Sequence, residues 1–287
     1  VHYAIPHASA AYLAKQILKY KGIHVPVITT LHGTDITLVG RDPSFEPVVT
    51  FSINESDGVT AVSESLKNDT YEEFEILSHI EVIPNFIDLN RFQKRPHEHF
   101  KKSLCPNGEK LLMHTSNFRK VKRIEDIVKV FAVVRKKIPA KVVLIGDGPE
   151  RSGIEALCRE LEVQCDVRFL GKMDGIEEAL SLADLFLLTS EKESFGLAAL
   201  EAMACGVPVI SSNSGGLPEV NKDGFSGYLS DVGDVAKMSS DAISLLKDEN
   251  KLAQFKVNAL ETAKLFDIQN IMPLYEQVYF KALNNSK

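Results

Sequence analysis

Short apolar runs alternate with longer amphipathic stretches along most of this chain. From Lys110 onward, apolar runs of strand length occupy residues 111–115, 141–145, 167–170, 185–188 and 207–211, with a weaker one at 227–229. Stretches with helical spacing fill the gaps at about 124–137, 151–161, 175–182 and 194–204, with a short turn at 217–220. Alternation of strands and helices is typical of βαβ units and a parallel sheet. This part is therefore predicted to be a complete doubly wound α/β domain.

The first third repeats the pattern with fewer strands. Strands are predicted at 26–31, 58–62 and 80–83, and helices at 8–21, 45–56 and 64–74. Three strands are too few for a full doubly wound domain, and the opening residues VHYAIPH resemble the end of a further strand. We therefore expect an incomplete N-terminal Rossmann-like domain over residues 1–95 that lacks its first strands.

The polar stretch 93–109, which contains Pro96 and Pro106, is predicted to be a linker to a second Rossmann-like domain over 96–267. Two such domains would face a shared cleft. The tail, 234–284, is amphipathic and helical, and Pro273 is expected to kink or break it near Ile271. The final segment, 268–287, is expected to pack back toward the N-terminal domain.

The composition argues against several classes of protein. The chain has 287 residues, 44% hydrophobic and 25% charged, as ordinary globular proteins do. Its net charge of −6 argues against nucleic-acid binding, and no apolar run approaches the roughly 18 residues of a membrane span. The four cysteines form no C-x-x-C pair, which indicates neither a metal site nor a disulfide framework and favours the reducing cytoplasm. A homodimer is left open.

One stretch, LFLLTSEKESFGLAALEAMACG at 185–206, combines a buried strand, a turn and a helix. Ser194 is the predicted N-cap of that helix and Gly206 its C-terminal stop. Beyond such a cap, the amides of Phe195, Gly196 and Leu197 would lack intrahelical partners and would form an anion site with the helix dipole.

Two carboxylates, Glu193 and Glu201, frame this predicted anion site. At about 1.5 Å per residue they stand roughly 12 Å apart along the helix, which is too far for a glycosidase acid and nucleophile acting on one bond. They could instead hold the two ends of a nucleoside diphosphate sugar. The alternative is that both are simply solvated at a helix edge.

Further candidates follow other predicted strands. His32 opens HGTD after the first of them, and SNFRKVKR at 116–123 offers four cations for phosphate, namely Arg119, Lys120, Lys122 and Arg123. GDGPE at 146–150 and GGLPE at 215–219 are glycine-containing turns. Each has an ordinary explanation as well: a lone histidine is often structural, a basic run is often a solvated face, and such turns are common.

In combination, these motifs resemble the family 4 retaining glycosyltransferases, which have the GT-B fold. The resemblance is carried by ESFGLAALE with its E-x(7)-E spacing, by EAMACGVPVI, by GGLPEV and by DGFSGYL, in the family's order. It implies that Glu193 holds sugar hydroxyls, that Glu201 holds the ribose, that Lys122 binds the diphosphate, and that His32 lies over the donor sugar. The remaining donor-site residues that it implies are Asn117, Arg119, Ser194, Phe195, Gly196 and Leu197. One departure is that Asn117 stands where the family usually has an arginine, which Arg119 would replace.

A narrower resemblance, to the bacillithiol-pathway branch of the family, is carried by VHYAIPHA, TTLHGTDIT, IPNFID and SNFRKVKR. It implies transfer of N-acetylglucosamine from UDP-N-acetylglucosamine to L-malate with retention, the first step of bacillithiol biosynthesis. A front-face reaction is expected, with His32, Glu193, Arg119 and Lys122 as the catalytic set and with no metal or other cofactor. Weaker candidates for the small dianionic acceptor are Tyr3, Thr30, Thr34 and Arg41.

Other functions remain open at this point. A family member could use another acceptor, such as a sugar, an inositol phosphate or a lipid. A UDP-sugar epimerase shares the fold and the donor, but it needs acid and base residues that converge on one sugar carbon. A non-catalytic sensor is disfavoured because His32 and both glutamates are present.

Overall fold

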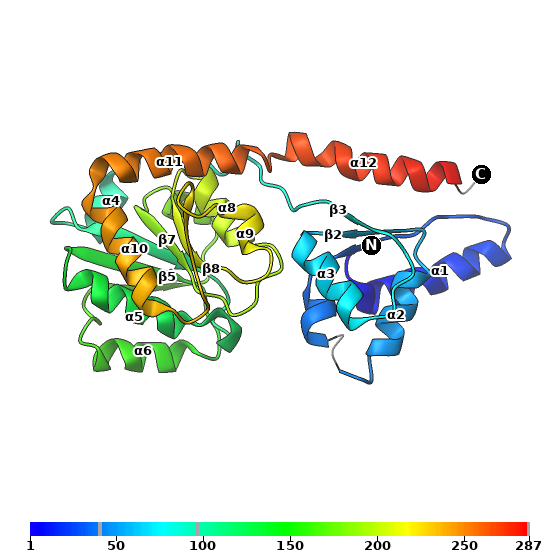
Figure 1. Cartoon of the computed structure of the whole chain (residues 1–287), viewed down its shortest axis with the longest axis horizontal. Coiled ribbons are helices and arrows are strands. Elements are labelled where there is room, and N and C mark those ends of the chain that lie inside the picture. Colours follow the sequence, from blue (N-terminus) through cyan, green and yellow to red (C-terminus); the bar gives the residue numbers. More distant parts are fainter. Residues whose placement is uncertain (40–41, 96–97, 286–287) are drawn as a thin grey trace. The chain divides into compact units, whose positions relative to one another are not determined.

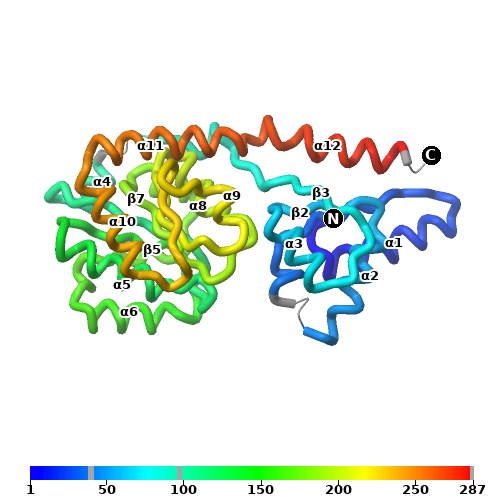
Figure 2. Tube along the Cα trace, viewed as in Figure 1, coloured from blue at the N-terminus to red at the C-terminus, as the bar shows by residue number. Residues whose placement is uncertain are grey.

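The computed structural model describes residues 1–39, 42–95 and 98–285 and divides the chain into two compact units (Figures 1 and 2). The first contains Val1–Phe86 together with Ile268–Lys287, and the second contains Ile87–Asp267. The boundary therefore falls at residue 86 instead of residue 95. The last helix is grouped with the first unit.

A three-stranded parallel sheet forms the centre of the first unit, in the order β1 (Ile28–Leu31), β2 (Gly58–Ala61), β3 (Ile80–Val82). Residues 1–3 run along the outer edge of β1, where the amide of Tyr3 donates to the carbonyl of Thr30. Around the sheet lie two π-helical turns and three α-helices: η1 (Ala4–Ala8), η2 (Asp35–Val39), α1 (Ser9–Tyr20), α2 (Glu46–Asn54) and α3 (Glu64–Glu73).

Helix α12 (Ile268–Asn285) completes the first unit by burying one face against the sheet. Ile271, Tyr275 and Val278 form a small apolar cluster with Ile83. The helix continues through Pro273, so of the predicted kink or break near Ile271 the break is wrong. The interruption lies at residues 265–267, after α11 (Glu249–Lys264).

Six parallel strands form the sheet of the second unit, in the order β6-β5-β4-β7-β8-β9. The predicted strands are thus all present as β4 (Lys110–Thr115), β5 (Ala140–Ile145), β6 (Val167–Gly171), β7 (Leu185–Leu188), β8 (Val209–Ser212) and β9 (Gly227–Ser230). The connecting elements are η3 (Lys120–Lys122), α5 (Ile124–Arg135), α6 (Arg151–Glu160), α7 (Ile176–Leu180), α8 (Leu197–Ala204), α9 (Leu217–Val220) and α10 (Val235–Lys247). The doubly wound prediction is confirmed for this unit.

Helix α4 (Glu98–Leu104) lies inside the stretch predicted to be a linker, and that prediction is wrong for these residues. The ammonium group of Lys101 lies 3.1 Å from both carboxylate oxygens of Asp184, which also pairs with Lys256 at 3.0 Å. Asp184 is buried and accepts the amide of Leu111 as well. Because a buried carboxylate needs such partners, α4 is fixed to the amino end of the sheet.

An extensive apolar core lies between the second sheet and one layer of helices, α5, α6 and α10. Phe118, Phe131, Met238 and Leu245 belong to it and are fully buried. Helices α8 and α11 pack against each other in the layer on the opposite face, as Figure 1 shows. Two helical layers around a parallel sheet leave only the strand ends free for function.

The strand order places a topological switch point between β4 and β7. After β4 the chain proceeds to β5 on one side, whereas β7 continues to β8 on the other. In open α/β sheets, ligands bind in the crevice at the carboxyl ends of the strands at such a point. The loops after β4 and β7 are therefore where a ligand site is expected in this unit.

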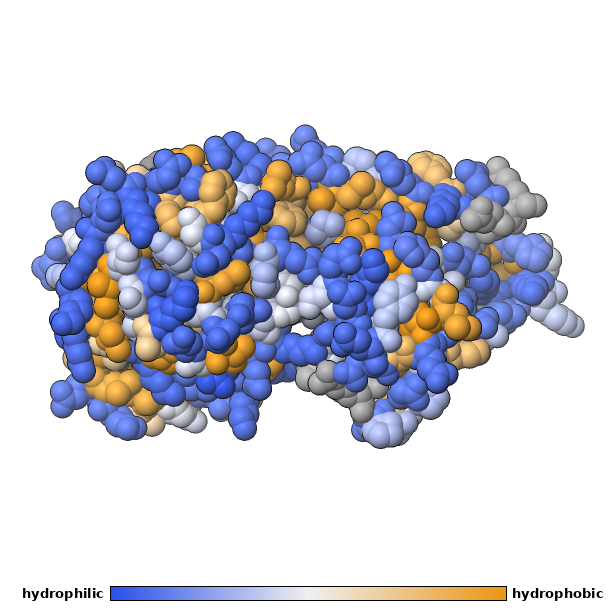
Figure 3. Space-filling model, viewed as in Figure 1, coloured by the Kyte–Doolittle hydropathy of each residue, from blue (hydrophilic) through white to orange (hydrophobic). Residues whose placement is uncertain are grey.

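Most of the visible surface is hydrophilic, with hydrophobic side chains gathered along α12 (Figure 3). Tyr279, Phe280 and Leu283 are exposed on that helix, and Leu13 and Ile17 are exposed on α1. Within the described residues, no helix combines the length and the hydrophobicity needed to cross a bilayer.

Candidate functional site: the carboxyl ends of the strands

In the second unit, main-chain hydrogen bonds join the loops at the carboxyl ends of β4 and β5. The amide of Phe118 donates to the carbonyl of Asp147 at 2.9 Å, and the amide of Glu150 donates back to the carbonyl of Phe118 at 3.0 Å. Gly148 packs so closely against Phe118 that a Cβ would lie 2.5 Å from its carbonyl oxygen. The GDGPE turn thus supports the SNFRKVKR loop directly.

The loop after β4 is also joined to the loop after β7, across the switch point. The amide of Glu191 donates to the carbonyl of Val121 at 2.8 Å. The hydroxyl of Thr189 lies 3.1 Å from the carbonyl oxygen of Lys122 and 2.9 Å from that of Arg123. The backbone at Lys122 is consequently fixed by the strand that leads to Glu193.

The loop after β8 completes the arrangement beneath Glu193. The amide of Gly216 donates to the carbonyl of Glu193 at 2.9 Å, and the hydroxyl of Ser214 donates to the carbonyl of Glu191 at 2.6 Å. Gly215 has a φ of +58°, and a Cβ there would collide with the carbonyl oxygen of Glu193. The two glycines of GGLPEV are therefore required by this close approach of two backbones.

These joined loops bring together Lys122 and Glu193, two residues 71 positions apart in the sequence. The Lys122 ammonium donates to Glu193 Oε2 at 2.6 Å, and the hydroxyl of Ser190 donates to the same oxygen at 3.2 Å. Both charged side chains are about one-fifth exposed, 20% and 19%. A cation and an oxygen acceptor thus lie side by side in a half-buried position, which suits a ligand that carries both phosphate and hydroxyl groups.

Helix α8 begins later than predicted. Its first residue is Leu197 and its N-cap is Gly196, with a left-handed φ of 103°, so the prediction of Ser194 as N-cap is wrong. The residue is glycine because only Gly adopts this conformation without cost, and because a Cβ there would lie 2.6 Å from Leu217 Cδ2. The amides without an intrahelical partner begin at Leu197, while Phe195 and Gly196 precede the helix. Gly206 has a φ of +72° just after the helix, as predicted for its C-terminal stop.

Glu201 lies on the second turn of α8 and is largely shielded from solvent. The pKa of its carboxyl group is raised to about 7, mainly by burial and also by the nearby carboxylate of Glu177, while Arg91 opposes the shift. Arg91 itself pairs with Glu177 at 3.4 Å. Glu201 can therefore gain or lose a proton near neutral pH, unlike a carboxylate at a solvated helix edge.

The two remaining donor-site candidates in the loop after β4, Asn117 and Arg119, are exposed. Across the part of the chain that the structure describes, the guanidinium of Arg119 forms no ion pair. It lies directly before η3, as the N-cap residue of this turn, whose last residue is Lys122. Arg119 is thus available to a ligand, whereas Lys122 already has a carboxylate partner.

His114 is a polar residue of this region that the sequence analysis passed over. Its imidazole is completely buried at the carboxyl end of β4 and bonds the carbonyl of Leu187 at 2.8 Å and the hydroxyl of Ser116 at 2.7 Å. The available signal was a histidine within the apolar run LLMHT, two residues before the basic loop. A buried polar side chain at a strand end is a common sign of a supporting role in a site.

In the first unit, His32 follows β1 directly and lies in a cluster of aromatic rings. Its Nε2 is 2.8 Å from Nδ1 of His2, and its ring centroid is 5.1 Å from that of Tyr3. The pKa of His32 is lowered to about 4, mainly by burial and also by the neighbouring His2. The turn beyond is held by the buried Asp35, which accepts the amides of Gly33 and Ala4.

We expect this low pKa to leave His32 neutral throughout the range from about pH 5.5 to about pH 8, because an imidazole is charged only below its pKa. Profiles of kcat/KM against pH, measured for the native protein and for His32→Asn, should then have the same shape. An inflection near the ordinary histidine pKa of about 6.5 that disappears in the variant would contradict this.

The predicted acceptor residues differ in their exposure and in their contacts. Tyr3 lies beside His32, and Thr34 is exposed. Thr30 is buried within the sheet, where its hydroxyl accepts that of Thr60 at 2.9 Å, so its side chain supports β1 and is not presented to a ligand. Arg41 lies outside the described residues.

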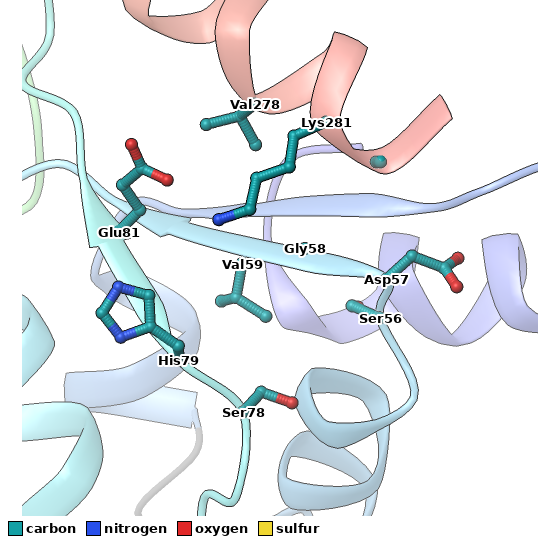
Figure 4. Close-up of a pocket in the computed structure, with 10 residues that line it drawn as sticks. Ser56, Asp57, Gly58, Val59, Ser78, His79, Glu81, Val278 and Lys281 are labelled. Carbon is teal, nitrogen blue, oxygen red and sulfur yellow. The ribbon is translucent and has the colours of Figure 1, made fainter. Parts of the chain in front are cut away.

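A cavity of about 230 Å³ in the first unit lies elsewhere, between α12 and the amino ends of β2 and β3. Figure 4 shows Lys281 of α12 extending over the strands toward Glu81, with His79 and Asp57 at its rim. None of the predicted site residues lines it. In the described part of the chain, no three His, Cys, Asp or Glu side chains are grouped as a metal site would require.

Comparison with known proteins agrees with this geometry. Residues 96–262, which carry the joined loops, match the family model described as glycosyl transferases group 1, and residues 1–91 match that of glycosyltransferase family 4. The chain belongs to the group 1 glycosyltransferases. The prediction from ESFGLAALE and the accompanying motifs is confirmed.

Relatives within this glycosyltransferase family differ in their named reactions. The chain is 47% identical over its whole length to N-acetyl-alpha-D-glucosaminyl L-malate synthase of Bacillus anthracis, of which it spans 75%. It is 29% identical to glycogen synthase of Mycobacterium tuberculosis, with 90% of this chain and 64% of that protein covered. It is 27% identical to D-inositol 3-phosphate glycosyltransferase 2 of Catenulispora acidiphila, with 91% and 66% covered.

Solved structures of similar fold are glycosyltransferases of the GT-B type. The Anabaena protein HepE in complex with UDP-glucose superposes with a TM-score of 0.82 at 22% identity, covering 96% of this chain and 76% of that one. Sucrose-phosphate synthase from Thermosynechococcus elongatus superposes with a TM-score of 0.84 at 22% identity, and the match covers 99% of this chain and 73% of that one. The predicted fold class is therefore confirmed.

Proposed function

We propose that this glycosyltransferase transfers N-acetylglucosamine from UDP-N-acetylglucosamine to L-malate with retention at the anomeric carbon. Identity of 47% along the whole chain with a relative that is named for this product supports the choice of acceptor. The observation that carries the donor assignment is the pair of Lys122 and Glu193 at the switch point. The cation suits the diphosphate, and the carboxylate suits sugar hydroxyls.

In the proposed reaction the leaving group is UDP, so the main requirement is to stabilise negative charge on its β-phosphate. Lys122, Arg119 and the amides at the start of α8 supply preorganised donors for that charge. Lys122 keeps its orientation through the carbonyl contacts of Thr189 and through Glu193. In this proposal the departing phosphate oxygen takes the proton of the acceptor hydroxyl, on the same face of the sugar. No metal and no cofactor beyond the donor takes part.

The acceptor is proposed to be a small dianion. Tyr3 and Thr34 remain candidates for contacts with it, and Thr30 is dropped because its hydroxyl is buried and paired. A cytoplasmic location is proposed because all four cysteines are free and three of them are buried. A homodimer stays a prediction, which light scattering would check.

The test is release of UDP from UDP-N-acetylglucosamine with L-malate, glycerol 3-phosphate, glucose or myo-inositol phosphate as acceptor. Stimulation by L-malate alone is expected, with activity unchanged in excess EDTA. Turnover with another acceptor would keep the donor site but overturn the acceptor. An absolute requirement for magnesium would contradict the metal-free mechanism.

The raised pKa of Glu201 gives this proposal a pH dependence. If its carboxylate accepts the ribose hydroxyls, bound UDP favours the ionised form and lowers the pKa from about 7. UDP affinity should then rise on the order of tenfold between about pH 5.5 and about pH 8.5, with release of a proton. Calorimetry in buffers of different ionisation enthalpy measures both the UDP affinity and the number of protons released.

The matched control is Glu201→Gln, which keeps the shape of the side chain but does not titrate. The UDP affinity of this variant should keep only the pH dependence that comes from ionisation of the UDP phosphate. Equal pH dependence in the native protein and in this variant would exclude Glu201 as the ribose acceptor.

A further inference from the structure

The one fully buried histidine imidazole among the described residues, that of His114, lies at the switch point. The residues before it on β4, Leu111, Leu112 and Met113, are apolar and equally buried. An imidazole in such a place is costly unless both ring nitrogens find partners. His114 has both, and the two partners belong to different parts of the site.

The partners determine which nitrogen carries the proton. Nδ1 lies 2.8 Å from the carbonyl oxygen of Leu187, which can only accept, so Nδ1 carries the hydrogen. Burial lowers the pKa of His114 to about 4, so the ring is neutral and Nε2 has a free lone pair. The hydroxyl of Ser116, 2.7 Å away, must therefore donate to Nε2. Its hydrogen is thus directed at the buried imidazole.

The two hydrogen bonds of His114 lie at the switch point, where β4 and β7 diverge. The ladder between β4 and β7 ends at the pair Met113 and Phe186, and the bond from His114 to Leu187 lies one residue beyond it. Ser116 is the first residue after β4 and opens the loop that carries Arg119 and Lys122. Its amide is bonded to the carbonyl of Ile145 at 3.1 Å. The start of the loop is thus held to β5 by its backbone and to β7, through His114, by its side chain.

We propose that His114 is a positioning residue for the phosphate-binding loop: through Ser116 it fixes the start of that loop relative to β7, and thereby sets Arg119 and Lys122 against the diphosphate of the donor. This inference rests on the proposed donor site. It predicts that the bond from His114 to Ser116 contributes to binding of the diphosphate and contributes nothing to binding of the nucleoside.

The bond can be broken from either end. In His114→Asn, the shorter side chain can keep an amide N–H directed at the Leu187 carbonyl, but it no longer reaches Ser116. In Ser116→Ala, the histidine keeps its bond to Leu187 and loses the same partner. The double variant closes a thermodynamic cycle. Dissociation constants for UDP and for uridine, measured by calorimetry on the chain and its variants, are the readout.

We expect each single variant to weaken UDP binding by about five- to tenfold, as loss of one hydrogen bond does, with no further loss in the double variant. Uridine binding should stay within about twofold in all of them. Equal losses for UDP and uridine would overturn the inference, because they would mean general disruption of the fold, and so would unchanged UDP binding. Should His114→Asn fail to fold, Ser116→Ala with the two ligands decides alone. Failure of the native chain to bind UDP would instead overturn the donor site itself.

Discussion

Replacing Lys122 by methionine is expected to lower kcat by about 10² to 10³, the usual loss when one preorganised donor is removed from a developing oxyanion. Methionine keeps the length and apolar stem of lysine, so packing changes little. The ammonium that the variant lacks lies 2.6 Å from Glu193 Oε2, and the Lys122 side chain is only about one-fifth exposed, so water replaces the charge poorly. Steady-state turnover of UDP-N-acetylglucosamine measures the effect, and UDP affinity should fall as well.

Lys120→Met provides the matched control. Lys120 belongs to the same short helical turn, η3, and is exposed. Both variants remove one positive charge from the loop, so they alter its long-range field alike. The Lys120 variant should keep kcat within about threefold, since exposed charges contribute little. Comparable losses of kcat in both variants would mean that the overall positive charge of the loop stabilises the leaving group. The specific contact of Lys122 would then make no separate contribution.

Replacing Gly215 by alanine is expected to remove almost all activity and to destabilise the protein by about 3 kcal/mol or more. Two costs combine: the left-handed φ of +58° costs a residue with a Cβ about 1 kcal/mol, and the Cβ collides with the carbonyl of Glu193. Relief of the collision must move either the loop after β8 or the backbone of Glu193. Urea unfolding and turnover measure the two consequences.

Gly224→Ala separates the two costs. Gly224 has a φ of +69°, but no atom lies within 4 Å of the place of its Cβ. Its alanine variant should lose only about 1 kcal/mol of stability and keep its activity. If the two alanine variants lost stability and activity equally, backbone strain alone would account for both, and the close approach at Glu193 would carry no functional weight.

The strands could be predicted because their signal is local. The four inner strands of the second unit, β4, β5, β7 and β8, are short and mostly apolar, as burial on both faces demands, whereas the edge strands β6 and β9 are partly exposed. The helix boundaries were less accurate: α8 begins three residues after the predicted cap, Ser194. Local preference favours serine as a cap, but the backbone of Gly215 and Gly216 occupies the space beside Glu193 and Ser194 and sets the turn.

The linker prediction failed for a similar reason. Polar composition and two prolines indicated an extended segment, yet α4 forms between them and is fixed by Lys101 to the buried Asp184, 83 residues away. The break expected at Pro273 is likewise absent from α12. The apolar face of that helix, including Tyr275 and Val278, packs on the first sheet, and this packing outweighs one lost backbone hydrogen bond.

By itself, the sequence determined the fold class, the family, and the residue types of the donor site, because glycine turns, a basic loop and spaced glutamates recur in a fixed linear order. Tertiary structure alone decided which of these groups meet. The pairing of Lys122 with Glu193, the neutral histidines at positions 32 and 114, and the shifted pKa of Glu201 depend on burial and on contacts between distant loops. Such contacts carry no local signature, because the partners are joined only when parallel strands bring their carboxyl ends to one edge of a sheet.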